Sequence, residues 1–155
     1  MIPAPVHILL VVFLACSPAV LLRQRESLDR QQLGESVALF WKSARWGDVA
    51  GLSSFLPRPE DQLAAARILA APTLRVTDVR VLQVVVGAEL VARKDRDHAD
   101  LEQRWREGTA LVHVEAFGLA TNRVESRTEE QKWVRGARGW QIDTLASPID
   151  ADRPW

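Results

Sequence analysis

Residues 40–52 of the chain are FWKSARWGDVAGL, and they show how the fold begins. Around them, apolar side chains recur at spacings typical of a helix: Leu33, Val37, Phe40, Trp41 and Ala44. Residues with this spacing share one face of an α-helix, so the pattern predicts an amphipathic helix over residues 28–46. Gly47 interrupts the pattern, and Asp48 is a typical N-cap. A second, shorter helix is therefore expected to follow directly.

A third helix and an antiparallel sheet make up the rest of the pattern. Pro59 stands at a suitable first helical position, and residues 63–71 continue as a helix that Pro72 ends. After Pro72 the hydrophobic period changes from 3.6 to 2 and β-branched residues become frequent, which indicates strands. The highly charged stretch 93–107 is expected to be an exposed connection. The expected strands are residues 73–86, 109–119, 125–135 and 140–145.

The composition limits the classes of function. The chain has 155 residues, its 20 Lys+Arg balance its 20 Asp+Glu, and it contains one cysteine. Zero net charge removes the attraction on which non-specific nucleic-acid binding depends, so no nucleic-acid partner is expected. One cysteine cannot form an intrachain disulfide or a cysteine-based metal site. The sequence also contains no HExxH, no GxSxG and no phosphate-binding glycine loop, and no cofactor is expected.

Residues 1–22 carry no Lys, Arg, Asp or Glu. Their uninterrupted apolar run, residues 8–16, suits the core of a secretory signal peptide better than a membrane-spanning helix, which needs roughly 20 residues. Three outcomes stay open. Cys16 follows the sequence FLA, as in the lipobox of bacterial lipoproteins, and would then be lipidated. The sequence SPA at residues 17–19 resembles a signal-peptidase site, and residues 6–22 would otherwise remain as one uncleaved anchor helix.

The charges beside this leader bear on which side of the membrane the body lies. Arg23 and Arg25 follow the leader directly, and the positive-inside rule would then give a single-pass anchor with a cytoplasmic body. The short apolar run favours export instead, so a membrane-associated body in the periplasm, or otherwise outside the cytoplasm, is the preferred expectation. The expected parts are a signal peptide or anchor (1–22), a linker (23–27), one domain (28–146) and a tail (147–155).

Two stretches resemble a known superfamily. In residues 40–52 an aromatic-containing helix ends at Gly-Asp and a second helix begins, which resembles the opening of NTF2-like (cystatin-like α+β cone) domains. Residues 130–143, EQKWVRGARGWQID, resemble the closing hairpin of that superfamily, in which a short glycine turn joins two strands and the second opens with Trp. The resemblance covers roughly residues 28–146 in type and order of elements. It implies an α+β fold in which N-terminal helices pack on a curved antiparallel sheet and leave a funnel.

Candidate acid–base groups occur at two places in the expected sheet. His113 and Glu115 lie two apart on one strand and therefore point to the same face. Asp78 lies on the first strand, on the face that the alternation assigns to Val76 and Leu82. Exposure or cover by a partner is favoured over catalysis for each of them. The resemblance implies that an isomerase would hold such a base inside the funnel and use tyrosine as a hydrogen-bond donor, and this chain has no tyrosine.

Other polar and aromatic residues indicate structure more than chemistry. The stretch 93–107 contains four possible metal ligands, Asp95, Asp97, His98 and Asp100. Positive side chains alternate with them and the EF-hand spacing is missing, so no metal site is expected. Trp41 and Trp140 are expected in the core, because tryptophans supply much of the apolar surface that a domain buries.

Several apolar residues are predicted to form a contact surface. The strand 109–119 is apolar on both faces, so helices that cover one face leave Leu111, Phe117 and Leu119 to be buried by a partner, most simply a second copy. Trp155, at the end of a polar tail, is a further candidate for docking onto a partner or a membrane. These residues are the expected interface.

The sequence therefore predicts a membrane-tethered, non-catalytic binding or assembly subunit of a bacterial envelope or membrane complex. Its expected partners are the membrane and either a second copy or another subunit, bound through the sheet face. The alternative is a small-molecule isomerase, dehydratase or cyclase of ketosteroid-isomerase type, which would use the funnel as a pocket with His113 or Asp78 as base.

Overall fold

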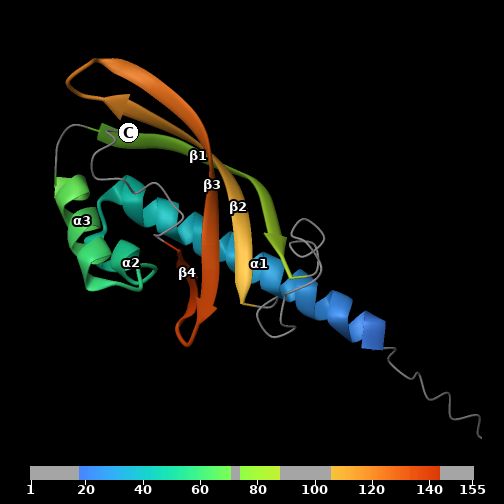
Figure 1. The fold of residues 1–155 in the computed structure, drawn as a ribbon. Coiled ribbons are helices and arrows are strands. Elements are labelled where there is room, and N and C mark those ends of the chain that lie inside the picture. The colour runs from blue at the N-terminus through green and yellow to red at the C-terminus, as the bar shows by residue number, and fades with distance from the viewer. Residues whose placement is uncertain (1–17, 71–73, 88–105, 144–155) are drawn as a thin grey trace, which may run out of the picture.

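The computed structural model describes residues 18–70, 74–87 and 106–143. Cys16, Trp155 and most of the charged stretch 93–107 lie outside these ranges, so the expectations for them stay predictions. The described chain is an α+β fold in which N-terminal helices precede a four-stranded sheet (Figure 1). Its elements are α1 (Pro18–Trp46), α2 (Val49–Ser53), α3 (Pro59–Ala70), β1 (Leu74–Val86), β2 (Glu107–Gly118), β3 (Arg123–Gly136) and β4 (Gly139–Ile142).

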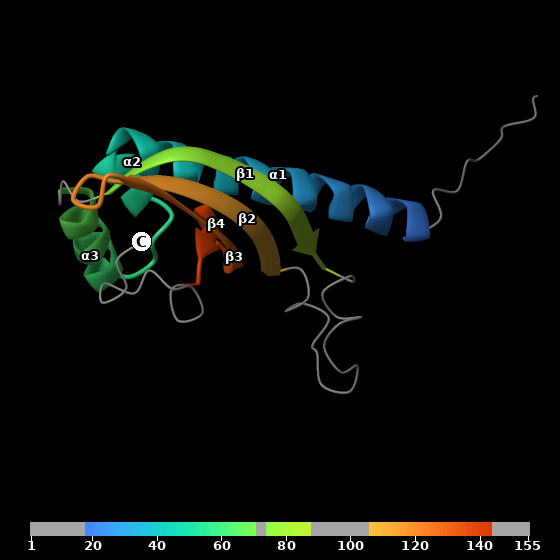
Figure 2. The same ribbon diagram turned by 90° about the horizontal axis from the view of Figure 1, so that it is seen from above.

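The sheet is an antiparallel meander with strand order β1-β2-β3-β4. The long strands curve, and α1 runs across one side of them (Figures 1 and 2). This arrangement confirms the expected fold class of helices packed on a curved antiparallel sheet. The hairpin between β3 and β4 closes at the pair Gly136 and Gly139, and Gly139 has φ of 100°, a conformation that side chains other than glycine rarely adopt.

The core lies between α1 and the face of the sheet that we call the inner face. Alternate residues of β2 are buried on this face, whereas the residues between them are half-buried on the opposite, outer face. Phe40 of α1 makes edge-to-face contacts with Trp41, Phe55 and Trp133 at ring separations of 5.5, 6.2 and 5.8 Å. Trp41 and Trp140 are buried, as predicted. The buried apolar residues that α1, β2, β3 and β4 contribute include Leu33, Val37, Phe40, Trp41, Ala110, Val112, Val114, Trp133, Trp140 and Ile142.

The first helix is longer than its apolar stripe predicts. It begins at Pro18 instead of residue 28, so the expected linker, residues 23–27, lies inside α1. Its first turns extend past the sheet (Figure 1), and their apolar side chains, Leu21, Leu22 and Leu28 among them, are exposed. The hydrophobic pattern does not reveal these turns, because they carry no stripe of buried apolar residues. No helix within the described ranges is long and apolar enough to span a membrane.

The connection from α1 to α3 contains the predicted helix end at Gly47 and the predicted N-cap at Asp48. Gly47 has φ of 68° and ends α1, and the carboxylate of Asp48 accepts a hydrogen bond of 2.9 Å from the backbone N–H of Gly51. At the start of α3, the guanidinium of Arg58 donates to Asp61 at 2.6 and 3.0 Å. This hydrogen bond raises the pKa of Arg58 above its ordinary value.

Two irregularities in β1 overturn the predicted distribution of its side chains. Val76 pairs with Ala116, but Asp78 pairs with Glu115, so the register shifts by one residue between Val76 and Asp78. Asp78 therefore lies on the outer face, and Val76 packs against the core on the inner face. The expectation that they share a face was wrong because strict alternation fails across a β-bulge. A second shift follows Val81, which leaves Leu82 exposed.

Candidate functional site

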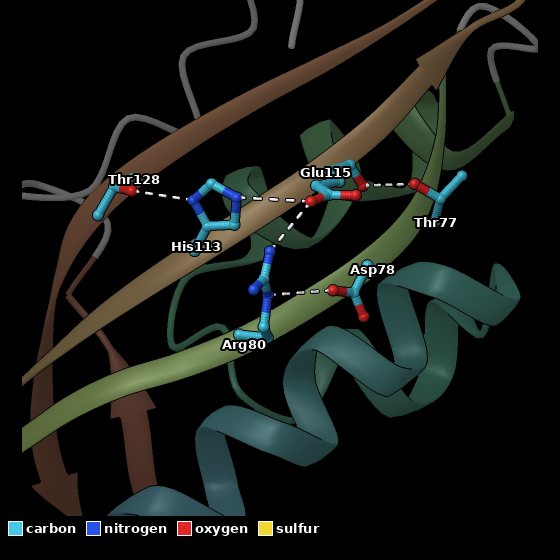
Figure 3. Close-up of polar contacts among 6 residues, drawn as sticks. All are labelled: Thr77, Asp78, Arg80, His113, Glu115 and Thr128. Carbon is cyan, nitrogen blue, oxygen red and sulfur yellow. Dashed lines mark hydrogen bonds and ion pairs between the residues drawn. The ribbon is translucent and has the colours of Figure 1, made fainter.

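The sheet brings the three candidate acid–base residues together on its outer face. His113 and Glu115 are alternate residues of β2, and both point away from the core. The register places Asp78 opposite Glu115 and Arg80 opposite His113. On the other side of β2, Thr128 of β3 lies opposite His113. Three neighbouring strands thus contribute side chains to one polar network, which we call the outer network (Figure 3).

Arg80 joins the two acids of the outer network. Its guanidinium lies 3.1 Å from Glu115 Oε1 and 3.3 Å from Asp78 Oδ2. His113 Nδ1 lies 3.0 Å from the hydroxyl of Thr128, and its Nε2 lies 3.6 Å from Glu115 Oε1 (Figure 3). Glu115 therefore faces two possible cations, and His113 is held from both sides of its ring.

The outer network is largely open to solvent. The side chain of Arg80 is 60% exposed, that of Asp78 48% and that of Glu115 33%. None of the three lines the groove between α1 and the end of the sheet or the small cavity beside Val114 and Arg127. Water therefore reaches these groups and screens their charges, whereas catalytic bases are usually tuned by burial. No cluster of metal-ligating side chains was found among the described residues.

Apolar side chains flank the outer network along the strands. Leu111 and Phe117 of β2 are half-buried on the same face as His113, one on each side of the charged residues. Val124 of β3 lies opposite Phe117 and is 63% exposed. Leu119 is also exposed, but it lies beyond the end of β2, in the turn that leads to β3. The predicted interface residues Leu111 and Phe117 thus share a face with the candidate acid–base groups.

A second polar cluster, which sequence reasoning missed, lies on the inner face of β3. Arg127 and Glu129 form an ion pair of 2.6 Å, and the side-chain amide of Gln131 donates to Glu129 at 2.7 Å. Gln131 is 1% exposed, and its side-chain oxygen has no hydrogen-bond partner among the described residues. The sequence does contain a sign of this cluster. Arg127, Glu129 and Gln131 are alternate residues that continue to Trp133, which is fully buried, so all of them lie on the same face of the strand.

Arg127 of this second polar cluster, which we call the inner cluster, lines a small cavity. Its volume is about 60 Å³, and Val114, Ala116 and Arg127 are among the residues that line it. This is room for one or two water molecules.

Comparison with protein-family models, with curated proteins and with solved structures finds no match for this chain. The predicted candidates His113, Glu115 and Asp78 form one outer network, and apolar residues flank it on an open face of the sheet. On the inner face, Arg127 of the second polar cluster lines a cavity of about 60 Å³.

Proposed function

We propose that this chain is a membrane-tethered, non-catalytic binding or assembly subunit of a bacterial envelope or membrane complex, built on an NTF2-like domain. One observation carries the proposal. The helices cover the inner face of the sheet, and the outer face keeps a charged network between the apolar residues Leu111 and Phe117. A centre of linked polar groups with apolar neighbours is a suitable composition for a contact surface.

The charges of this face favour a second copy as the partner. The outer network contains acids, Asp78 and Glu115, and the bases Arg80 and His113. In a dimer with a two-fold axis through this face, the same patch of both copies forms the interface, and the two patches run in opposite directions. Arg80 of one copy would then lie near an acid of the other. A face with one sign of charge would repel its own copy. The mixed face therefore supports a homodimer packed sheet to sheet.

The tether is supported by the start of α1. The helix begins at Pro18, two residues after the apolar run 8–16, and its exposed leucines continue that apolar character up to Leu22. Arg23 and Arg25 then follow on the same helix. Apolar residues followed by arginines are typical of the level at which a helix leaves a bilayer.

The dimer is tested by sedimentation equilibrium of the full chain in detergent. We compare the native chain with Leu111→Lys and with Leu63→Lys, which places the same charge on an exposed leucine of α3. The native chain and the Leu63 variant should sediment as dimers, and the Leu111 variant as a monomer with unchanged circular dichroism. A native chain that stays monomeric over the whole concentration range contradicts the homodimer.

The tether is tested on native membranes. Membranes washed with 1 M salt or with carbonate should keep the chain, and intact-mass analysis of the recovered protein should show either a retained leader or a lipid on Cys16. Recovery of the full chain, including Met1, in the wash would remove the membrane part of the proposal.

The alternative function, a small-molecule isomerase, dehydratase or cyclase, has weaker support. Its proposed bases, His113 and Asp78, lie on the outer face. The inner face offers Glu129, whose side chain is only 9% exposed, but the cavity that its partner Arg127 lines is only about 60 Å³. Ligand pockets usually measure roughly 300 to 1,000 Å³. The enzyme function would therefore need the inner face to open.

A further inference from the structure

The pair His113 and Glu115 presents a nitrogen donor and an oxygen donor on the outer face of β2 (Figure 3). Nε2 of the imidazole lies 3.6 Å from Oε1 of the carboxylate. Two ligand atoms on one tetrahedral zinc ion lie about 3.4 Å apart, because each bond is about 2.1 Å long. The pair therefore has nearly the separation of two ligands on one metal ion. The two side chains are 24% and 33% exposed, so an ion can reach them.

A third residue holds the imidazole in the orientation that metal binding needs. Nδ1 of His113 lies 3.0 Å from the hydroxyl oxygen of Thr128, which lies opposite it on β3. A histidine ligand usually donates the N–H of its other ring nitrogen to a nearby acceptor. When Nδ1–H donates to Thr128, Nε2 keeps its lone pair, and this nitrogen is the one beside Glu115. Thr128 is thus a positioning residue for His113.

Arg80 competes with a cation for the carboxylate, but it has a second acid as a partner. Its Nη2 lies 3.1 Å from Glu115 Oε1, and its Nε lies 3.3 Å from Asp78 Oδ2. The side chain of Arg80 is 60% exposed, so it has room to turn away from Glu115 and keep its contact with Asp78. The ion pair that a metal ion would replace is exposed, and exposed ion pairs contribute little to stability.

A second copy completes the set of ligands. One copy supplies two ligands, whereas a structural zinc site usually has four, and no group of three metal-ligating side chains occurs among the described residues of one copy. In the proposed homodimer, a two-fold axis through the outer face brings the same pair from the other copy. Facing sheets pack about 10 Å apart, a distance that two ligating side chains can span when one comes from each sheet.

We propose that the homodimer binds one zinc ion on its two-fold axis, through His113 Nε2 and a carboxylate oxygen of Glu115 from each copy. The inference rests on the proposed function, because the site is incomplete without the second copy. Imidazole with carboxylate is a donor set that suits zinc, whereas magnesium and calcium prefer oxygen ligands alone. The consequence is that zinc strengthens the dimer and fixes the register of the two sheets.

The test is sedimentation equilibrium of the full chain in detergent, with either EDTA or zinc chloride in the buffer. The dissociation constant of zinc from the dimer is measured by calorimetric titration. Free zinc at ten times this constant should lower the dimer dissociation constant about 11-fold, if the ion binds only the dimer. Native mass spectrometry should show one zinc ion for each pair of chains. Magnesium chloride at the same concentration should leave the dimer dissociation constant unchanged.

Four variants locate the ion. His113→Gln and Glu115→Gln each remove one ligand from each copy, so their dimer dissociation constants should be the same in zinc and in EDTA. Circular dichroism shows whether each variant folds, and either one alone is a sufficient test. Glu130→Gln is the matched control for the carboxylate, because Glu130 is exposed on the same face, opposite Leu111. His98→Gln is the control for the imidazole. Both controls should respond to zinc like the native chain.

The outcomes separate the metal site from the dimer. A native dimer whose dissociation constant does not change with zinc would overturn the metal site alone, and His113 and Glu115 would then form an ion pair only. The metal site is also wrong if His113→Gln and Glu115→Gln respond to zinc like the native chain, because the ion then binds elsewhere. A chain that stays monomeric with and without zinc contradicts the homodimer itself, and the metal site with it.

Discussion

Adding one methyl group at Gly108, the second residue of β2, tests how closely α1 approaches the sheet. A Cβ placed there would lie 2.4 Å from Leu33 Cδ2 and 3.3 Å from both the Trp140 ring and the carbonyl oxygen of Val85. Leu33 is 0% exposed, so its side chain has no open space into which it can withdraw. The substitution Gly108→Ala must therefore push α1 and β2 apart or force Leu33 out of its rotamer.

The expected cost follows from two opposing effects. Overpacking a close-packed core costs about 1–3 kcal/mol, and replacing a strand glycine by alanine returns about 0.5–1 kcal/mol through the unfolded chain. The net destabilisation lies between about 0 and 2.5 kcal/mol, with a central value of about 1 kcal/mol. Gly34 of α1 provides the matched control, because its added Cβ meets nothing closer than Val84 Cγ2 at 3.9 Å. Gly34→Ala should stabilise the protein by about 0.5–1 kcal/mol, since alanine favours the helix.

The assay is equilibrium unfolding in urea, followed by tryptophan fluorescence, with native chain and both variants in the same detergent. Buried Trp133 and Trp140 report on the contact between α1 and the sheet. The two variants should shift the unfolding midpoint in opposite directions, with slopes like that of the native chain. A Gly108 variant as stable as the Gly34 variant would show that the helix is not packed against β2 as the structure has it.

Two further substitutions test single contacts in the same assay. Asp48→Ala removes the N-cap acceptor of the Gly51 N–H and should cost about 1 kcal/mol; a neutral result would mean that the cap contributes nothing to the turn after α1. Asp29→Asn breaks the ion pair with Arg135 and should cost about 1–3 kcal/mol, whereas removing the exposed carboxylate in Glu60→Gln should change stability by less than about 0.5 kcal/mol. Equal effects of the two would show that Asp29 is not buried.

The parts of the fold that sequence reasoning predicted are those with a local physical signal. The apolar stripe from Leu33 to Ala44 predicted the packed half of α1, and Gly47 with Asp48 predicted the turn that follows it. The alternation of residues in β2 predicted which side chains share each face of the strand. Each of these depends on neighbouring residues alone. The first ten residues of α1 bury no stripe, so their helical state was not visible in the hydrophobic pattern.

The candidate site depended on contacts that alternation cannot give. A β-bulge after Val76 moves Asp78 to the outer face, and only the pairing of β1 with β2 places it near Glu115. Bulges leave little trace in a single sequence, because the extra residue, Thr77, suits a strand as well as any other. His113 and Glu115 were paired by their spacing, and Asp78 was a separate candidate on another strand. That the three lie together follows only from the sheet register.

The inner cluster was missed for a different reason. The segment from Arg127 to Gln131 carries so many charges that an exposed strand is the ordinary expectation. Trp133 on the same face shows that the strand enters the core, and the polar residues before it are carried inward by the period of two. A buried tryptophan at one end of a charged strand is thus a usable sign that the residues two and four before it are turned inward.

The two polar clusters bear differently on association and on catalysis. In the outer network, Arg80 forms ion pairs with two acids, and water reaches every member. In the proposed homodimer, these ion pairs could be replaced by equivalent ion pairs between the two copies, so that no charge would be buried without a partner. In the inner cluster, Gln131 is 1% exposed and its side-chain oxygen has no hydrogen-bond partner among the described residues, so a polar group that reached it would satisfy a buried acceptor. The proposed association through the outer face would therefore leave the packing of the described core unchanged.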